Sequence, residues 1–160
     1  MSVVVGPVAI PAVVDRPEIV ITISDNEVWI DEFNRWASPL SDGIAFAAAA
    51  NLATALNSAN VAVLSQAIGA GDYTVAIEVQ RFESAPGSYA LIDALYSVRR
   101  NADGRAVSGR TTDRQSTTDK SYDAMAAAHS RAIARLANDV AGAVRGLSAQ
   151  PLRNAASLPR

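Results

Sequence analysis

His129 is the only histidine in this chain of 160 residues, and it is the side chain best suited to acid–base chemistry. A histidine beside a serine can serve as the general base of a hydrolase, and serines and aspartates are plentiful in the sequence. However, no Gly-x-Ser-x-Gly turn is present, and His129 falls within a predicted helix, where it reaches a substrate only through a cleft. We interpret His129 as a half-exposed helix residue that takes part in no reaction, and a small hydrolase is the remote alternative.

Metal and phosphate sites find little support in the composition. One histidine and no cysteine cannot supply the usual ligands of zinc. The acidic residues at positions 25, 27, 31 and 32 could hold a hard cation, but they fall on a predicted hairpin where solvated charge is usual. The segment 69–72 lacks the lysine of a phosphate loop and precedes a strand rather than a helix. We predict no catalytic residue, no metal and no cofactor.

Arginines gather around a turn predicted at residues 103–104, and they are Arg99, Arg100, Arg105, Arg110 and Arg114. Nucleic-acid sites usually place stacking aromatic rings among the basic residues, and Tyr96 is the only ring nearby. Because the net charge is also negative, at −2, we predict no nucleic-acid partner. A lipid headgroup or an acidic protein remains an alternative to plain solvation, with Arg99, Arg100 and Arg110 as candidate contacts.

Asp93 is unusual because it lies in a run, residues 91–95, where both faces of the predicted strand look buried. A carboxylate in such a place needs a hydrogen-bonding or charged partner. We prefer an arginine of the same fold as that partner, and a contact across a subunit interface is the alternative.

Charge is divided between the two halves of the chain. Residues 1–80 contain nine acidic and two basic residues, a net charge of −7, whereas residues 81–160 contain seven acidic and twelve basic residues, a net charge of +5. We interpret the halves as complementary surfaces that meet within the fold or between subunits. A basic patch for an anionic partner is the alternative.

The composition is that of one folded domain, with 49% hydrophobic and 19% charged residues. Apolar runs are shorter than the roughly 20 residues of a membrane-spanning helix. The absence of cysteine excludes disulfides and fits an extracytoplasmic or a cytoplasmic protein. The first residues contain neither a signal peptide nor a lipobox cysteine, so we expect a trimmed, mature start.

The hydrophobic pattern predicts strands and two helices. Strands are expected over residues 3–10, 19–24, 27–31, 61–64, 73–80, 89–99 and 107–117. The run at 3–10 should be an edge strand or contain a bulge, because Pro7 interrupts it. We expect the strand at 89–99 to be central and the one at 107–117 to lie nearer an edge.

The two predicted helices span residues 39–56 and 121–144. Ser38 should be the N-cap of the first helix, with Pro39 in its first turn and Trp36 packing its start against the sheet. Ser121 should cap the second helix, and Gly146 should end it. We predict one α/β domain over residues 1–147, a sandwich of a mixed, mostly antiparallel sheet with two main helices, and a flexible tail over 148–160.

Two motifs resemble the PqiC-like, or DUF330-type, family of ABC-type transport auxiliary lipoproteins. They are Arg35-Trp36-Ala37-Ser38-Pro39-Leu40 and Ser121-Tyr122-Asp123-Ala124-Met125, and weaker matches lie at residues 5–11, 15–17, 24–27, 73–75 and 79–82. The resemblance spans about residues 3–144. It implies a three-layer α/β domain in which Trp36, Ala37, Pro39, Leu40, Tyr122 and Asp123 have structural roles. It supplies no catalytic residue.

The resemblance also implies a function and a location. The chain would be a non-enzymatic accessory subunit of an ABC/MCE-type lipid transport system, lipid-anchored on the periplasmic face of the outer membrane of Gram-negative bacteria. Its partners would be an MCE-type protein and a permease/ATPase system, and it would act by protein–protein assembly. Unpaired strand edges and divided charge also suit a homo-oligomer. The alternative is a periplasmic carrier that holds an acyl chain in an apolar cavity.

Overall fold

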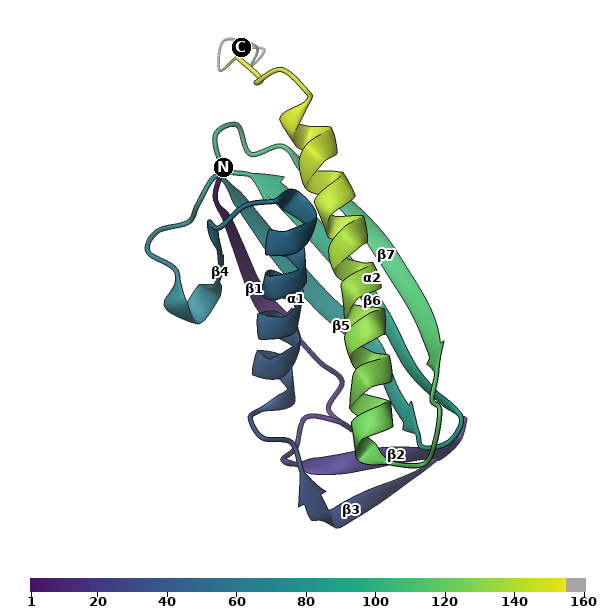
Figure 1. Ribbon diagram of the computed structural model, residues 1–160. Coiled ribbons are helices and arrows are strands. Elements are labelled where there is room, and N and C mark those ends of the chain that lie inside the picture. The colour runs from purple at the N-terminus through teal and green to yellow at the C-terminus, as the bar shows by residue number, and fades with distance from the viewer. Residues whose placement is uncertain (155–160) are drawn as a thin grey trace.

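The computed structural model describes residues 1–154 as one α/β unit (Figure 1). The helices are α1 (Leu40–Leu56) and α2 (Tyr122–Ser148), with one short 3-10 turn, η1 (Leu64–Gln66). The strands are β1 (Val3–Ala9), β2 (Glu18–Ser24), β3 (Glu27–Arg35), β4 (Val61–Val63), β5 (Tyr73–Ala85), β6 (Tyr89–Arg100) and β7 (Ala106–Ser116).

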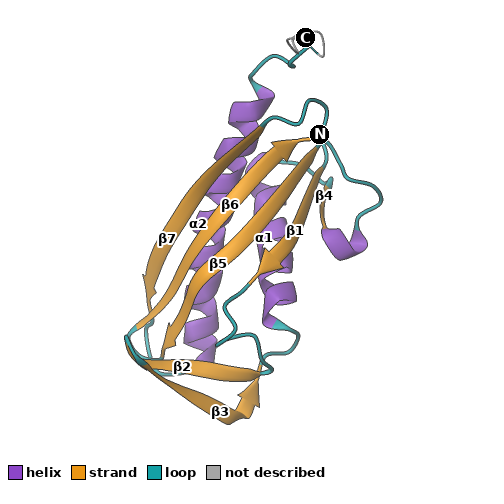
Figure 2. Ribbon diagram, turned by 180° about the vertical axis from the view of Figure 1, so that it is seen from behind, coloured by secondary structure: helices purple, strands orange, loops and turns teal. Residues whose placement is uncertain are grey.

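The large sheet has five strands in the order β4-β1-β5-β6-β7, and β2 and β3 form a separate two-stranded sheet. Strand β1 is parallel to β4 and β5, whereas the pairs β5–β6, β6–β7 and β2–β3 are antiparallel. The predicted fold class is therefore confirmed. Both helices lie on one face of the large sheet, as the view from behind shows (Figure 2). The β2–β3 hairpin does not cover the other face of the sheet but crosses one end of the molecule.

The core lies between the helices and the inner face of the sheet. Leu136, Val140 and Val144 recur every three to four residues along α2 and are buried, as are Ile44 and Leu52 of α1. Alanines alternate with these larger residues and let the helices approach the sheet closely, so the cavity left between them measures only about 10 Å³. Each fully buried leucine or isoleucine here contributes roughly 2 kcal/mol.

Strand β1 contains the bulge that Pro7 suggests. Its pairing with β5 shifts register between Val5 and Val8, and the Gly6–Pro7 peptide bond is cis. Strand β4 pairs only with Val3–Val5. Pro7 therefore stands where β1 is an edge strand and no neighbour needs its missing N–H.

The predicted ends of the helices are correct at one of three places. Ser121 caps α2 and accepts a hydrogen bond of 3.1 Å from the N–H of Ala124. Ser38 does not cap α1: Pro39 is the capping residue, with an extended ψ of 133°, and no side chain caps the helix. The N–H of Trp36 donates to the carbonyl of Pro17 at 3.0 Å, and the chain bends at Ala37 and Ser38 before the helix begins.

Gly146 does not end α2, which continues to Ser148. The reason is that Leu147 extends the buried stripe of the helix and is itself fully buried. The apolar burial gained there outweighs the roughly 1 kcal/mol that a glycine costs in a helix.

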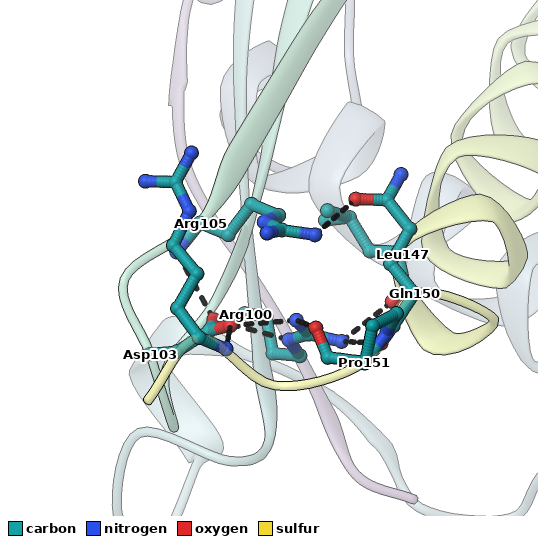
Figure 3. Close-up of polar contacts among 7 residues, drawn as sticks. Arg100, Asp103, Arg105, Leu147, Gln150 and Pro151 are labelled. Carbon is teal, nitrogen blue, oxygen red and sulfur yellow. Dashed lines mark hydrogen bonds and ion pairs between the residues drawn. The ribbon is translucent and has the colours of Figure 1, made fainter. Parts of the chain in front are cut away.

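Arg100 fixes the end of α2 to the turn between β6 and β7 (Figure 3). Its side chain is only 5% exposed and forms two hydrogen bonds with the Asp103 carboxylate, at 3.0 and 2.6 Å. It also donates to the carbonyls of Leu147 at 2.6 Å, Gln150 at 2.7 Å and Pro151 at 3.1 Å. Carbonyls in the last turn of a helix have no partner within the helix, and Leu147 is one of these. The same arginine also binds two carbonyls of the segment that follows the helix.

The same cluster holds the segment that follows α2. The N–H of Arg153 donates to Asp103 at 3.0 Å, and the Arg100 hydrogen bonds keep the pKa of the Asp103 carboxyl well below its usual range. Of the tail predicted as flexible, Ser148 therefore belongs to the helix, and residues 150–153 make these contacts. Residues 155–160 lie outside the described part of the chain.

We expect Arg100→Met to lower the melting temperature by about 10 °C, because it leaves the Asp103 carboxylate and three carbonyls without their donor. The control is Arg99→Met, one residue earlier and exposed, which should change the melting temperature by about 1 °C or less. Circular dichroism melting measures both. Equal effects of the two variants would contradict a structural role for Arg100.

Candidate functional site

The fold brings His129 of α2 beside Ser84 of β5. The Ser84 Oγ and the His129 Nε2 share a hydrogen bond of 2.8 Å, which is the distance between a nucleophile and its general base. However, the His129 ring is 4% exposed and the Phe82 ring stacks on it at 3.9 Å. Its Nδ1 has no hydrogen-bond partner among the described residues, so no third group orients a base. The pair is part of the core and is closed to substrate.

Burial also sets the charge state of His129. It lowers the pKa of the imidazole from 6.5 to about 4, so the ring is neutral near neutral pH. His129 lies on a helix as predicted, but its expected half-exposed position is wrong, because the ring is buried beneath Phe82. Nothing in the sequence indicated Ser84 as its partner.

Asp93 has the internal arginine that the sequence interpretation preferred. Arg110 donates to both carboxylate oxygens, at 2.8 and 2.6 Å, and the Thr112 hydroxyl donates at 3.0 Å. The Arg110 hydrogen bonds lower the pKa of Asp93 despite its burial. The guanidinium of Arg110 is exposed above the carboxylate on the face of the sheet away from the helices, whereas Arg99 is exposed near the β6–β7 turn and Arg100 is internal.

The described part of the chain also lacks metal-ligating clusters and membrane-spanning helices. Residues 1–154 contain no cluster of three or more histidine, aspartate or glutamate side chains suited to a metal ion. None of the helices described is long and apolar enough to cross a membrane.

Trp36 and Tyr122, from the two signature motifs, attach the β2–β3 hairpin to the rest of the fold. Both pack against a small cluster formed by Ile19 and Ile21 of β2 and Met125 of α2. The Trp36 ring also meets Phe82 of β5 edge-to-face, with centroids 6.2 Å apart. These contacts join the hairpin to both the sheet and α2.

The other signature residues have different surroundings. Leu40 is buried in the main core, and Asp123 is exposed in the first turn of α2, where a negative charge favours the helix dipole. Ala37 and Pro39 line a surface hollow of about 420 Å³ beside the segment 15–17.

Asp31 holds a bulge at the end of the hairpin. The register of β2 and β3 shifts so that residues 32–34 have no partner on β2. The buried Asp31 carboxylate accepts hydrogen bonds from the N–H of Phe33 at 3.0 Å, the Asn34 amide at 2.8 Å and the Tyr122 hydroxyl. The Tyr122 hydrogen bond is the main cause of the lowered pKa of Asp31. A bulge fixed in this way redirects a side chain.

The side chain that the bulge presents is Phe33, which is 93% exposed. Trp29 on the same strand is 53% exposed, and Ile23 and Val28 near the hairpin turn are also exposed. We call these four residues the hairpin surface, although Val28 and Trp29 are neighbours on β3 and therefore point to opposite faces of the hairpin. Exposed aromatic side chains that cluster on a rigid element are typical of protein–protein contact sites. Sequence patterns did not find this surface, because Phe33 reads as one more apolar residue before Trp36.

Acidic side chains surround the hairpin surface. Asp25, Glu27 and Glu32 are exposed on the same hairpin. The candidate site is therefore an apolar surface with an acidic rim, and its geometry suits binding rather than catalysis.

Comparisons with known proteins identify a matching family. The family profile described as "ABC-type transport auxiliary lipoprotein component" matches residues 1–141. No curated protein matches the chain.

Similar solved structures share the fold. An uncharacterized protein has a TM-score of 0.77 at 22% identity, with 89% of this chain and 92% of that chain covered. A DUF330 protein from Xanthomonas campestris has a TM-score of 0.69 at 21% identity, covering 92% and 86%. The PelC dodecamer from Paraburkholderia phytofirmans has a TM-score of 0.52 at 14% identity, covering 86% and 83%.

We expect acid to destabilise the protein through His129. In the unfolded chain the imidazole takes up a proton near pH 6.5, whereas in the folded protein it does so only near pH 4. Stability is therefore complete above pH 6.5 and falls as the pH decreases, by roughly 3 kcal/mol at pH 4. Urea unfolding across this range measures the change. Because the chain has no other histidine, His129→Gln should remove the slope between pH 6.5 and 5, and an unchanged slope would contradict the assignment.

Proposed function

The chain belongs to the family of ABC-type transport auxiliary lipoprotein components, and we propose that it is a non-enzymatic assembly subunit that contacts its transport partner through the hairpin surface. The family membership supports an accessory lipoprotein role. The finer assignment, to an MCE-type lipid transport system of the Gram-negative envelope, is our proposal. In it the partners are an MCE-type protein and a permease/ATPase system.

The exposed Phe33 is the observation that supports this proposal. An aromatic ring that is 93% exposed costs solvation free energy unless a partner covers it. The bulge that carries it is not a loose loop, because Asp31 binds the bulge to Tyr122 of α2. A surface that is already rigid loses little conformational entropy on binding, which favours affinity.

The position of the hairpin suits such a contact. It lies at the opposite end of the molecule from Met1 (Figure 1). In our proposal a lipid attached on the N-terminal side of Met1 holds the domain at the periplasmic face of the outer membrane. The hairpin surface would then project away from that membrane, toward a protein that reaches it from the periplasm.

The two alternative functions find less support. An acyl-chain carrier needs an apolar cavity of several hundred Å³ that encloses the chain. The enclosed space between the helices and the sheet is about 10 Å³, and the larger hollows, of about 410 and 420 Å³, are open at the surface. A hydrolase would need access to Ser84 and His129, and both side chains are buried.

Homo-oligomerisation is a second part of the proposal. Strands β4 and β7 are the outer strands of the large sheet, and each has an edge without a partner strand in the described chain. Such edges favour pairing between subunits. The similar PelC structure is described as a dodecamer, which supports an assembly of several copies here.

We expect the photo-crosslinking residue p-benzoylphenylalanine at position 33 to capture the MCE-type subunit in intact cells. The reason is that Phe33 would lie within the contact. The measurement is an immunoblot for that subunit.

The matched control places the same residue at Phe46, an exposed phenylalanine of α1 that is not part of the hairpin. Capture at 33 and not at 46 supports the proposal. Equal capture at the two positions, or capture at neither, would show that the hairpin is not the partner-binding surface.

We also expect the purified domain to have a mass in solution of at least twice the single-chain mass of 16.7 kDa. Light scattering during gel filtration measures this mass over a range of concentrations. A single-chain mass at the highest concentration would refute self-association of this domain.

A further inference from the structure

The N-terminus and the last described residues of the chain lie at the same end of the molecule. Met1, the β6–β7 turn and the last turn of α2 lie together there (Figure 1), and the view from behind agrees (Figure 2). The segment after α2 is held at the same place by Arg100 and Asp103 (Figure 3).

Four arginines at this end have no acidic partner. They are Arg99 on β6, Arg105 after the turn, Arg145 in the last turns of α2 and Arg153 beyond it. None of them forms an ion pair within residues 1–154. We call these four residues the basic end.

Their hydrogen bonds leave their charges uncompensated. Arg105 donates to the neutral amide of Gln150, and Arg145 donates to the carbonyl of Ala55 at the end of α1. Arg99 folds over the turn, with its Nη2 3.4 Å from the position that a Cβ would take on Gly104. The guanidinium groups of Arg99, Arg105 and Arg145 therefore lie near the β6–β7 turn and the C-terminal ends of α1 and α2.

The remaining arginines of the predicted cluster are not available. Arg100 is internal and paired with Asp103, and Arg110 is paired with Asp93. Arg114 lies over the Tyr89 ring, 3.8 Å from its centroid, farther along the sheet. The structure thus separates the arginines with internal roles from those that face solvent.

Two acidic residues lie at the same end, and each has a cationic partner of its own. Asp103 points inward to Arg100, and the exposed Asp72 lies 3.9 Å from the Met1 ammonium and accepts a hydrogen bond of 2.7 Å from the N–H of Ser2. The exposed acids of the N-terminal half, such as Asp25, Glu27 and Glu32, lie at the hairpin on the other end. The four arginines of the basic end therefore lie at the opposite end of the molecule from these three acidic residues.

We propose that the basic end docks on an anionic phospholipid surface and sets the orientation of the domain. Exposed apolar side chains accompany the arginines, namely Met1 at the start of the chain and Leu152 next to Arg153. Arginines mixed with apolar side chains suit the boundary between headgroups and acyl chains. The basic end includes no aromatic ring that could stack with nucleic-acid bases.

The helix dipoles weaken this attraction only slightly. Both α1 and α2 end here, and helix C-termini carry partial negative charge. However, Arg145 and Arg100 donate to carbonyls at these two ends and offset that charge. The positive charges of the four arginines remain without an ion pair within residues 1–154.

The expected strength follows from the number of arginines. Each arginine near an anionic surface strengthens binding about fivefold, so loss of three should weaken it about 100-fold. The interaction should also weaken as salt rises, because the Debye length falls from about 30 Å at 0.01 M to about 10 Å at 0.1 M. This inference goes beyond the proposed function and does not depend on the hairpin contact.

The test is co-sedimentation of the purified chain with phosphatidylglycerol vesicles at about 0.01 M salt. The wild-type chain should bind these vesicles and not phosphatidylcholine vesicles. The variant Arg99→Gln/Arg105→Gln/Arg153→Gln should bind about 100-fold more weakly. A double variant, Arg99→Gln/Arg153→Gln, leaves the contact between Arg105 and Gln150 intact if the triple variant is unstable.

The charge-matched control is Arg35→Gln/Arg114→Gln/Arg135→Gln, which removes three exposed arginines away from the basic end. It should retain most of the binding. An equal loss in the control would show that only net charge matters, and absence of wild-type binding or equal binding to phosphatidylcholine would overturn the proposal. The hairpin crosslink would be unaffected by any of these results.

Discussion

The packing of α2 along the large sheet is the interaction on which the rest of this structure depends. Its 27 residues make a helix about 40 Å long, so a single rigid element reaches from the hairpin to the basic end. Its buried stripe, from Met125 to Leu147, runs nearly the whole length, and this burial is what the fold gains most from. Because the helix is continuous, the two ends of the molecule keep a fixed distance and orientation.

A buried charged residue binds each end of α2: one connects it to the hairpin, and the other connects it to the basic end. At its start, Asp31 of β3 accepts a hydrogen bond from Tyr122, and at its end Arg100 of β6 donates to the carbonyl of Leu147. Both charged groups have several further hydrogen bonds, which offsets the desolvation that burial costs. An apolar contact could also hold these places, but it would fix direction less well than hydrogen bonds of defined geometry. The charged residues therefore act as positioning groups: one presents Phe33, and the other holds residues 150–153.

The sequence predicted the fold well where periodicity carries the information. The strands from β5 to β7 and both helices were predicted because burial on one face imposes a period of two or of 3.6 residues. It failed where contacts distant in sequence decide. Ser38 is a residue type that often caps helices, yet the chain bends at Ala37 and Ser38 and the helix begins only after Pro39. Arg100 looked like a surface residue beside Arg99, although strand alternation already placed it in phase with the buried Val98. Phe33 is exposed because of a bulge, and no periodic pattern encodes a bulge.

The two surfaces are exposed, whereas the one pair with the geometry of a nucleophile and a base is buried. A catalytic protein must open a cleft to its reacting groups, whereas here the one pair with suitable geometry, Ser84 and His129, is closed by Phe82. What the fold exposes instead is an aromatic surface with an acidic rim at one end and free arginines at the other. Like charges at one end of a subunit disfavour head-to-head association with the same end of another copy. Each end is therefore available to a different partner. A rigid body with two unlike ends can orient one partner relative to another without moving, which is a sufficient physical role for an accessory subunit.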